Sequence, residues 1–140
     1  MTKAFTQLTF TPEVRRWQER HGSRQSYERL EQGPVSGDRL GPGEQEFVRG
    51  IDGFYQATVS ASGWPYVQFR GGPRGFLRVL DEKTIGYADL RGNKQYLSAG
   101  NLSEDDRVML FLMDYENQER LKIWGRARFT QDYQALTVPE

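Results

Sequence analysis

Six short stretches of β-type sequence follow one another between residues 54 and 129. Residues 54–61 and 65–70 alternate apolar and polar side chains, and a Ser-Gly-Trp turn separates them. This alternation predicts strands, and the short linker predicts a hairpin. The other four stretches are 75–80, 84–89, 107–115 and 120–129. Strands this short and closely spaced predict a mainly β fold, a small six-stranded antiparallel β-barrel with flanking helices rather than an α/β layer fold.

Helical sequence precedes the strands. Thr11 can cap a helix that has Pro12 in its first turn, and a second helical stretch covers residues 23–33. A loop rich in glycine and proline follows over residues 33–43, with a short helical turn after it. The N-terminal part of the chain is therefore expected to be a polar helical lead.

We divide the chain into this lead with its Gly/Pro-rich loop, residues 1–46, and a barrel domain, residues 47–140. One helix is expected inside the barrel domain. Residues 93–102 have helical character, with Gly92 or Asn93 at the start.

Residues 107–115 are almost continuously apolar. A strand of this kind is typical of burial on both faces. In a barrel of this size, we expect part of the strand to be buried in a contact between subunits. The sequence therefore predicts a homodimer.

Composition excludes several classes of site. The chain has no cysteine, which removes disulfides, thiolate nucleophiles and Cys-ligated metals, and a single histidine, His21, nearly excludes a catalytic triad or a multi-histidine metal site. Nineteen basic residues balance nineteen acidic ones, so no global attraction to nucleic acid or anionic membranes is expected. No apolar run is long enough for a membrane span, and no signal peptide is recognisable, so we expect a soluble, cytoplasmic protein.

A Gly-Gly-Pro-Arg-Gly segment at residues 71–75 directly follows a predicted strand. Its glycines let the backbone approach a ligand closely, and Arg70 and Arg74 can bind phosphate oxygens. The pattern matches neither the Walker nor the dinucleotide-binding fingerprint. A β-turn with two exposed arginines is the alternative interpretation.

A second basic turn that contains glycine lies at residues 91–95. If a helix begins at Gly92 or Asn93, its free backbone amides and its dipole favour an anion, and Lys94 adds a full positive charge. The alternative is a capped helix with a solvated lysine. Two such turns, each leaving a strand, favour a site for a phosphate group.

Linked motifs occur in order along residues 47–129, among them GWPYVQFRGGPRGFLRVLD, GYADLRGNKQYLSAGNL and RLKIWGRAR. Together they resemble the pyridoxamine 5′-phosphate oxidase-related family of FMN-binding split-barrel flavoproteins, and most closely a branch with GGPxGFLRVLD and RGNxQY segments. The resemblance implies a six-stranded split barrel, usually a homodimer, with FMN in the groove between the two subunits.

The resemblance also implies which residues contact the cofactor. These are Gln68, Phe69, Arg70 and Gly71 along the flavin and its phosphate, Tyr87 and Ala88 as further flavin contacts, Asn93 and Lys94 at the phosphate with Gln95 beside them, and Arg120 reaching the flavin from the partner subunit. Asn93 departs from the family pattern, which has arginine there. The resemblance implies no metal ligand, and the residues allow no assignment of a catalytic acid or base.

These observations predict an FMN-binding flavoprotein that acts as an oxidoreductase on a small molecule. The chain ends soon after the sixth strand, where longer relatives add a segment that completes the active site, which argues against true pyridoxamine phosphate oxidase activity. The alternative is a non-catalytic carrier of flavin, deazaflavin or haem. Haem is the least favoured of these, because His21 is the one histidine that could bind its iron and it lies outside the barrel motifs. A third interpretation, an oligonucleotide-binding barrel, is opposed by the zero net charge.

Overall fold

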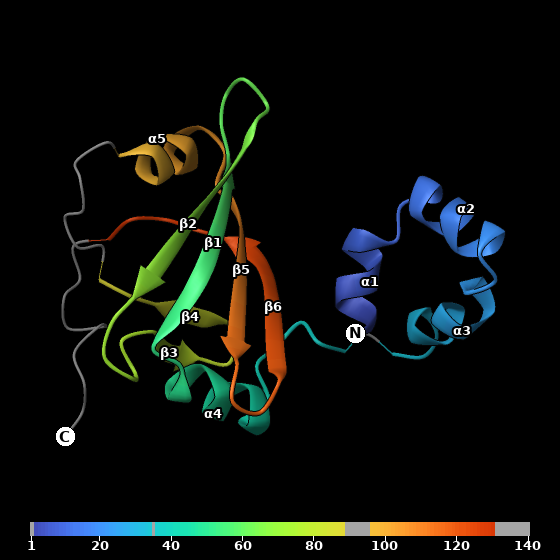
Figure 1. The fold of residues 1–140 in the computed structure, drawn as a ribbon, viewed down its shortest axis with the longest axis horizontal. Helices are drawn as coiled ribbons and strands as arrows, with labels where there is room; N and C mark the ends of the chain where they lie inside the picture. Colours follow the sequence, from blue (N-terminus) through green and yellow to red (C-terminus); the bar gives the residue numbers. More distant parts are fainter. Residues whose placement is uncertain (1, 35, 89–95, 131–140) are drawn as a thin grey trace. The chain divides into compact units, whose positions relative to one another are not determined.

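The computed structural model describes residues 2–34, 36–88 and 96–130. The chain divides into two compact units, residues 1–40 and 41–140, and each is described by itself (Figure 1).

Short helices make up the first unit. They are α1 (Lys3–Thr9), α2 (Pro12–Arg20), α3 (Arg24–Glu28) and the single-turn helix η1 (Arg29–Glu31). The predicted start of α2 is confirmed, because the hydroxyl of Thr11 accepts a hydrogen bond from the backbone N–H of Val14 at 3.3 Å. Glu31 in η1 forms ion pairs with Arg15 of α2 at 3.3 Å and with Arg24 of α3 at 2.6 Å. These pairs link the second and third helices of the unit.

The second unit contains the strands, and all six predicted strands are present. Its elements are α4 (Pro42–Gly50), β1 (Gly53–Val59), β2 (Pro65–Gly71), β3 (Arg78–Asp81), β4 (Thr84–Gly86), α5 (Leu97–Glu104), β5 (Arg107–Asp114) and β6 (Glu119–Arg126). Strands β2, β1, β5 and β6 form, in this order, one antiparallel sheet, and β3 and β4 form a separate antiparallel hairpin. The fold is therefore mainly antiparallel β with flanking helices. Among the described residues, no ladder of hydrogen bonds joins the two sheets into a closed barrel.

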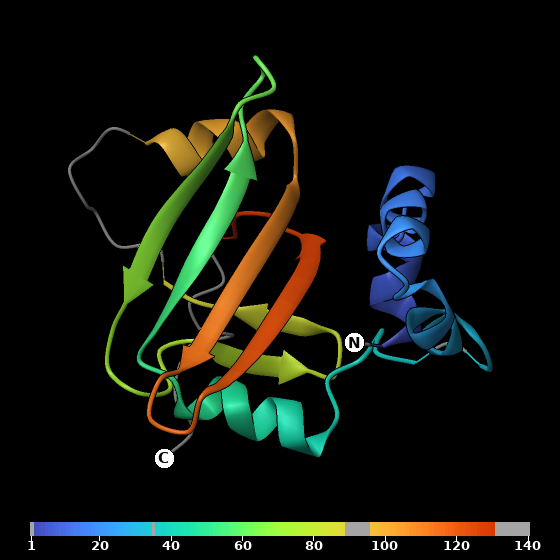
Figure 2. The same cartoon turned by 45° about the vertical axis from the view of Figure 1, so that its right-hand side comes forward.

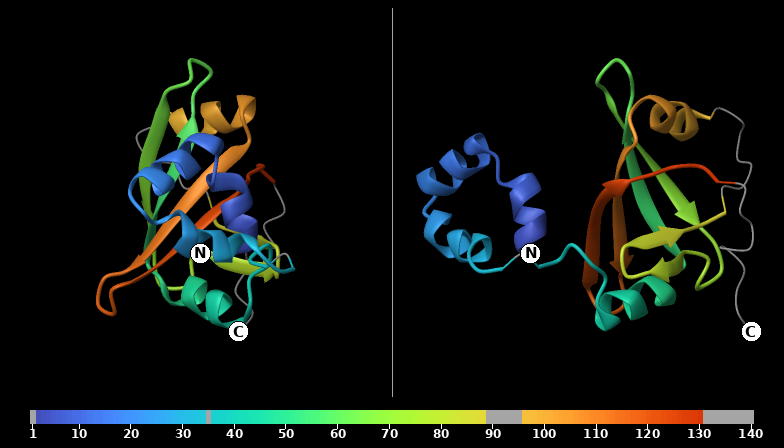
Figure 3. Two further views of the ribbon diagram at one scale, coloured as in Figure 1. Left: turned by 90° about the vertical axis from the view of Figure 1, so that its right-hand side faces the viewer. Right: turned by 180° about the vertical axis from the view of Figure 1, so that it is seen from behind.

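A hydrophobic core fills the space between the two sheets. Side chains alternate along a strand, so Phe54, Leu110 and Leu112 point to the same face of the four-stranded sheet. They are buried together with Val48 of α4 and Leu77 at the entry to β3. Figure 2 shows the β3–β4 hairpin crossing this face with α4 at one end of the sheet, and Figure 3 shows α5 at the other end. We call this the inner face, and the opposite one the outer face.

The first strand of the hairpin is shorter than predicted. Strand β3 begins at Arg78 instead of residue 75. Gly75 has a φ of 84°, and the backbone N–H of Phe76 donates to the carbonyl of Pro73 at 2.9 Å. The chain is therefore still in a turn at the position where the sequence pattern suggests a strand.

The helix inside the barrel domain starts later than predicted. Helix α5 begins at Leu97 rather than at Gly92 or Asn93. Tyr96, directly before it, has a left-handed conformation with a φ of 56°, which a right-handed helix cannot include. The free amides of this helix therefore lie at residues 97–99, several positions beyond the predicted phosphate turn.

The helices of the described residues are short, and the longest, α2 and α4, have nine residues each. None of those helices combines the length and the apolar character that crossing a membrane requires.

The predicted burial of residues 107–115 on both faces is wrong for the single chain. Leu110 and Leu112 are buried on the inner face, whereas Met109, Phe111 and Met113 on the outer face are only half-buried. The chain therefore buries one face of β5 and leaves the other accessible.

Candidate functional site

Strand β2 distributes the predicted cofactor residues over both faces of the sheet. Gln68 and Arg70 lie opposite Gln56 and Phe54 of β1 and share the inner face, whereas Phe69 points to the outer face. In the described sheet β2 is an edge strand, so one side of its backbone has no strand partner. The inner-face residues of β2 therefore lie at an edge of the described sheet.

Arg70 and Tyr87 come together on the inner face. The guanidinium carbon of Arg70 lies 5.7 Å from the centroid of the Tyr87 ring, within the range of a cation–π interaction. The Tyr87 ring packs edge-on against Phe54 with centroids 5.2 Å apart, and its hydroxyl donates a hydrogen bond to the side-chain carbonyl of Gln56. A positive charge is thus held beside a half-buried aromatic ring, an arrangement that suits a ligand with an anionic group and a flat ring.

Helix α5 is fastened to this edge through polar contacts. The hydroxyl of Ser98 donates to the side-chain carbonyl of Gln68 at 2.8 Å, and the amide of Asn101 donates to the hydroxyl of Thr58 at 3.0 Å. Ser98 lies in the first turn of α5, where backbone N–H groups have no partner within the helix. The first turn of α5 is therefore held close to Gln68.

Gln56 is a buried polar residue in the middle of β1. It is 2% exposed, and its side-chain nitrogen Nε2 makes no hydrogen bond with any residue that the structure describes. Gln56 was not among the residues predicted from the sequence. The available signal was a polar side chain in register with Phe54 on the strand face expected to be buried.

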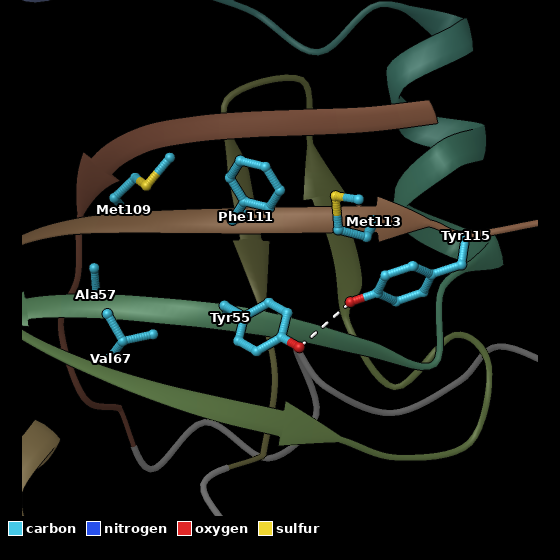
Figure 4. Close-up of a pocket in the computed structure, with 7 residues that line it drawn as sticks. All are labelled: Tyr55, Ala57, Val67, Met109, Phe111, Met113 and Tyr115. Atoms are coloured by element: carbon cyan, nitrogen blue, oxygen red, sulfur yellow. Dashed lines mark hydrogen bonds between the residues drawn. The ribbon is translucent and has the colours of Figure 1, made fainter. Parts of the chain in front are cut away.

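The outer face of the sheet carries a shallow apolar groove of about 380 Å³. Its lining residues are Tyr55, Ala57, Val67, Met109, Phe111, Met113 and Tyr115. Figure 4 shows the side chains from β5 lying in a row and the hydroxyls of Tyr55 and Tyr115 facing each other, 3.3 Å apart. The hydrogen bond with Tyr55 raises the pKa of Tyr115 above its usual value. The groove is therefore almost entirely apolar, with one pair of phenols at its end.

Phe69 lies over glycine residues on the same outer face. A Cβ atom on Gly53 would come within 2.4 Å of its ring, and one on Gly71 within 3.0 Å. Phe69 is 57% exposed, and its ring meets the Tyr55 ring at an angle of 62°. Glycine at both positions thus leaves room for an aromatic side chain that extends the apolar surface of the groove.

The sequence of residues 42–137 matches the family described as pyridoxamine 5′-phosphate oxidase. The match covers well over half of the chain, from α4 through all six strands. The chain belongs to the pyridoxamine 5′-phosphate oxidase family. This confirms the resemblance on which the site prediction rests. No curated protein matches the sequence significantly.

A solved structure has a similar fold. It is the crystal structure, at 1.98 Å resolution, of a tagged variant of HupZ from Group A Streptococcus. The two chains share 19% sequence identity, and the TM-score is 0.54 over 69% of this chain and 78% of the HupZ chain. At this identity the similarity concerns the fold, and it agrees with the antiparallel architecture of the family.

Ala88 and Arg120 are two further residues that the family resemblance implied and that the structure describes. Ala88 is exposed directly after Tyr87. Arg120 is exposed on β6, opposite Met113, and so lies on the outer face. Three strand spacings separate β2 from β6, roughly 14 Å. Within one chain, Arg120 therefore does not approach Arg70. Three further predicted residues, Asn93, Lys94 and Gln95, lie outside the described residues.

Proposed function

We propose that this member of the pyridoxamine 5′-phosphate oxidase family is a homodimeric FMN-binding flavoprotein that acts as an oxidoreductase on a small molecule. In this proposal the four-stranded sheet and the β3–β4 hairpin are the two parts of a six-stranded split barrel. The observation that carries the proposal is the contact between Arg70 and Tyr87 at the open edge of β2.

The residues at this edge fit the chemical groups of FMN. A phosphomonoester carries about two negative charges near neutral pH, and the guanidinium of Arg70 supplies a positive charge with several donors. The first turn of α5 brings partly unpaired backbone amides close to Gln68. Tyr87 offers an aromatic surface beside this charge. Asn93, Lys94 and Gln95 complete the proposed phosphate site, with Gly71 and Ala88 beside the flavin.

Bound FMN would supply the electron transfer, and the protein would bind and orient the ring and exclude water. Arg70 would hold the phosphate, and Gln68 would offer its amide N–H groups to an acceptor on the ring while its carbonyl stays bonded to Ser98. Phe69 would contribute apolar surface from the other side of the strand. No side chain is assigned as a general acid or base.

Two features support a homodimer as the active form. The outer face keeps an apolar groove accessible in the single chain, and a second copy would cover it. Arg120 lies on that same face, away from Arg70. A site that uses both residues therefore needs two subunits, as the family resemblance implies.

The proposal is tested by purifying the full chain and recording its absorbance spectrum, followed by titration of the apoprotein with FMN. We expect flavin bands in the purified protein or saturable uptake of one FMN per chain. Protein that is colourless and takes up no FMN contradicts the proposal. Adding NADH or NADPH without oxygen then tests the reaction, because bleaching of the flavin bands supports an oxidoreductase and persistent lack of reduction supports a carrier.

A further inference from the structure

The side chain of Gln56 is in an unusual state for a buried amide. Its carbonyl oxygen accepts the hydrogen bond from Tyr87, whereas its nitrogen Nε2 is shielded from solvent and makes no hydrogen bond within the described part of the chain. A buried donor without a partner lowers the stability of a fold. An apolar side chain of similar shape would avoid this cost, since Gln56 adjoins core residues such as Leu110 and Phe54.

The hydrogen bond to Tyr87 gives this amide a role that an apolar side chain could not take. It fixes the hydroxyl end of Tyr87, and the contact with Phe54 fixes the ring. The guanidinium of Arg70 lies over that same ring, 5.7 Å from its centroid. The position of the Arg70 charge is therefore linked to Gln56 through one intervening side chain.

We propose that Gln56 is a positioning residue for the anion site: by holding the hydroxyl of Tyr87, it sets where the guanidinium of Arg70 meets a bound phosphate. This inference rests on the proposed function for the identity of the ligand, FMN. It adds a residue that touches neither the phosphate nor the ring and acts through Tyr87.

Two substitutions remove the same hydrogen bond from its two ends. Gln56→Met keeps the length of the side chain but removes both the acceptor and the unpartnered donor. Tyr87→Phe keeps the ring but removes the described partner of the Gln56 carbonyl oxygen, so that neither polar atom of the buried amide then has a described hydrogen bond. A positioning role predicts that both variants lose affinity for FMN, whereas their effects on stability differ in sign.

Thr6→Val is the matched control. Thr6 lies in the first unit, is 0% exposed, and its hydroxyl donates a hydrogen bond to the backbone carbonyl of Lys3 at 2.8 Å. The substitution removes one side-chain hydrogen bond of a buried residue, as the test variants do. Thr6 belongs to a different compact unit from the residues of the proposed site, so FMN affinity should remain within about twofold of the wild type.

The experiment measures the Tm of each apoprotein and the Kd of each for FMN. For both Gln56→Met and Tyr87→Phe we expect a rise in Kd of about fivefold to tenfold, the effect of one hydrogen bond. The Tm of Gln56→Met should be unchanged or higher, and that of Tyr87→Phe lower. The double variant should have a Kd within about twofold of the single variants rather than the product of their effects. Wild-type affinity in Gln56→Met, or multiplied effects in the double variant, overturns the inference.

An NMR measurement on the apoprotein, without any ligand, tests this inference independently of the proposed function. The Nε–H group of Arg70 is shielded from solvent, and its NMR signal in the apoprotein is assigned by its loss in Arg70→Met. We expect this signal to shift in Gln56→Met and in Tyr87→Phe but not in Thr6→Val. If the wild-type protein binds no FMN and the signal still shifts, the proposed cofactor is wrong and the positioning role is supported. An unchanged signal in Gln56→Met contradicts the positioning role whatever the cofactor is.

Discussion

The guanidinium of Arg70 lies over the ring of Tyr87, and the two residues come from distant parts of the second unit's sequence. Arg70 is in the edge strand β2, and Tyr87 directly follows β4. Phe54 lies beneath both, opposite Arg70 in the register and edge-on to Tyr87. A charge, an aromatic ring and the hydrophobic core are therefore joined at one edge of the fold.

The core beneath this site sets the stability of the second unit. Leu112 has no exposed surface, so Leu112→Ala should lower the free energy of unfolding by about 2–5 kcal/mol. Urea denaturation followed by circular dichroism measures this value. Leu80→Ala, at a position that is 41% exposed, should change it by less than about 0.5 kcal/mol. Equal losses of unfolding free energy in the two variants would contradict the prediction that the described core stabilises this unit.

The outer groove predicts how the chain associates. Phe111 is half-buried in the middle of this groove, and Phe111→Arg would place a charge in the contact between two copies. We expect light scattering at micromolar concentration to report a dimer for the wild type and a monomer for this variant. Leu80→Arg, with the same change of charge outside the groove, should remain a dimer. If the wild-type protein is a monomer, the prediction that the groove forms a contact between subunits is wrong.

The carboxyl group of Asp105 should titrate at unusually low pH. Hydrogen bonds from the side chain of Arg107, at 2.9 and 2.6 Å, lower its pKa from 3.8 to about 2. Because the folded pKa is depressed, this group favours the folded state above pH 3.8, and that contribution is lost as pH falls from 3.8 to about 2. Arg107→Met should return the pKa part of the way, because the backbone N–H of residue 107 still donates at 3.1 Å.

NMR titration of the side-chain carboxyl carbons checks this. Asp114 is the internal reference, since its pKa is lowered by hydrogen bonds from Asn117 instead. In Arg107→Met the titration of Asp114 should be unchanged. A pKa of Asp105 that does not move would show that Arg107 is not the cause.

The phenol of Tyr115, at the end of the groove, should have a pKa above its usual value. The hydrogen bond with Tyr55 raises the pKa of Tyr115. The raised pKa means that the neutral phenol favours the folded state below pH 10, and this contribution is lost as pH rises through the folded pKa. Tyr55→Phe should therefore lower the pKa of Tyr115 in an ultraviolet titration, whereas Tyr66→Phe, on the other face of the sheet, should leave it unchanged.

Sequence patterns predicted the strands because alternation is a local property. Phe54 and Thr58 mark the buried face of β1 in the sequence itself, and the same rule assigns Arg70 and Phe69 to opposite faces. Element ends were less predictable, since they depend on single backbone conformations. Tyr96 has a left-handed conformation and fixes the start of α5. Tyrosine rarely adopts this conformation, so the sequence does not indicate it.

The candidate site was predictable only in part for a related reason. Arg70 and Tyr87 followed from the family resemblance, and the structure adds their contact. Gln56 was not predicted as a site residue because its contact is with Tyr87, which directly follows the β3–β4 hairpin. The packing of the two sheets decides which residue contacts Gln56. The periodicity of side chains along one strand carries no information about that packing.

The central claim, that Arg70 beside Tyr87 binds the phosphate of FMN, is tested most directly by comparing FMN dissociation constants of two arginine variants. Arg70→Met should raise Kd by about tenfold to a hundredfold, the effect of one charge-assisted hydrogen bond. Arg20→Met removes the same charge from a similar position over an aromatic ring, 4.8 Å from the centroid of Trp17 in the first unit, and should leave Kd within about twofold. Equal affinity of Arg70→Met and wild type, or equal loss in both variants, would contradict the account.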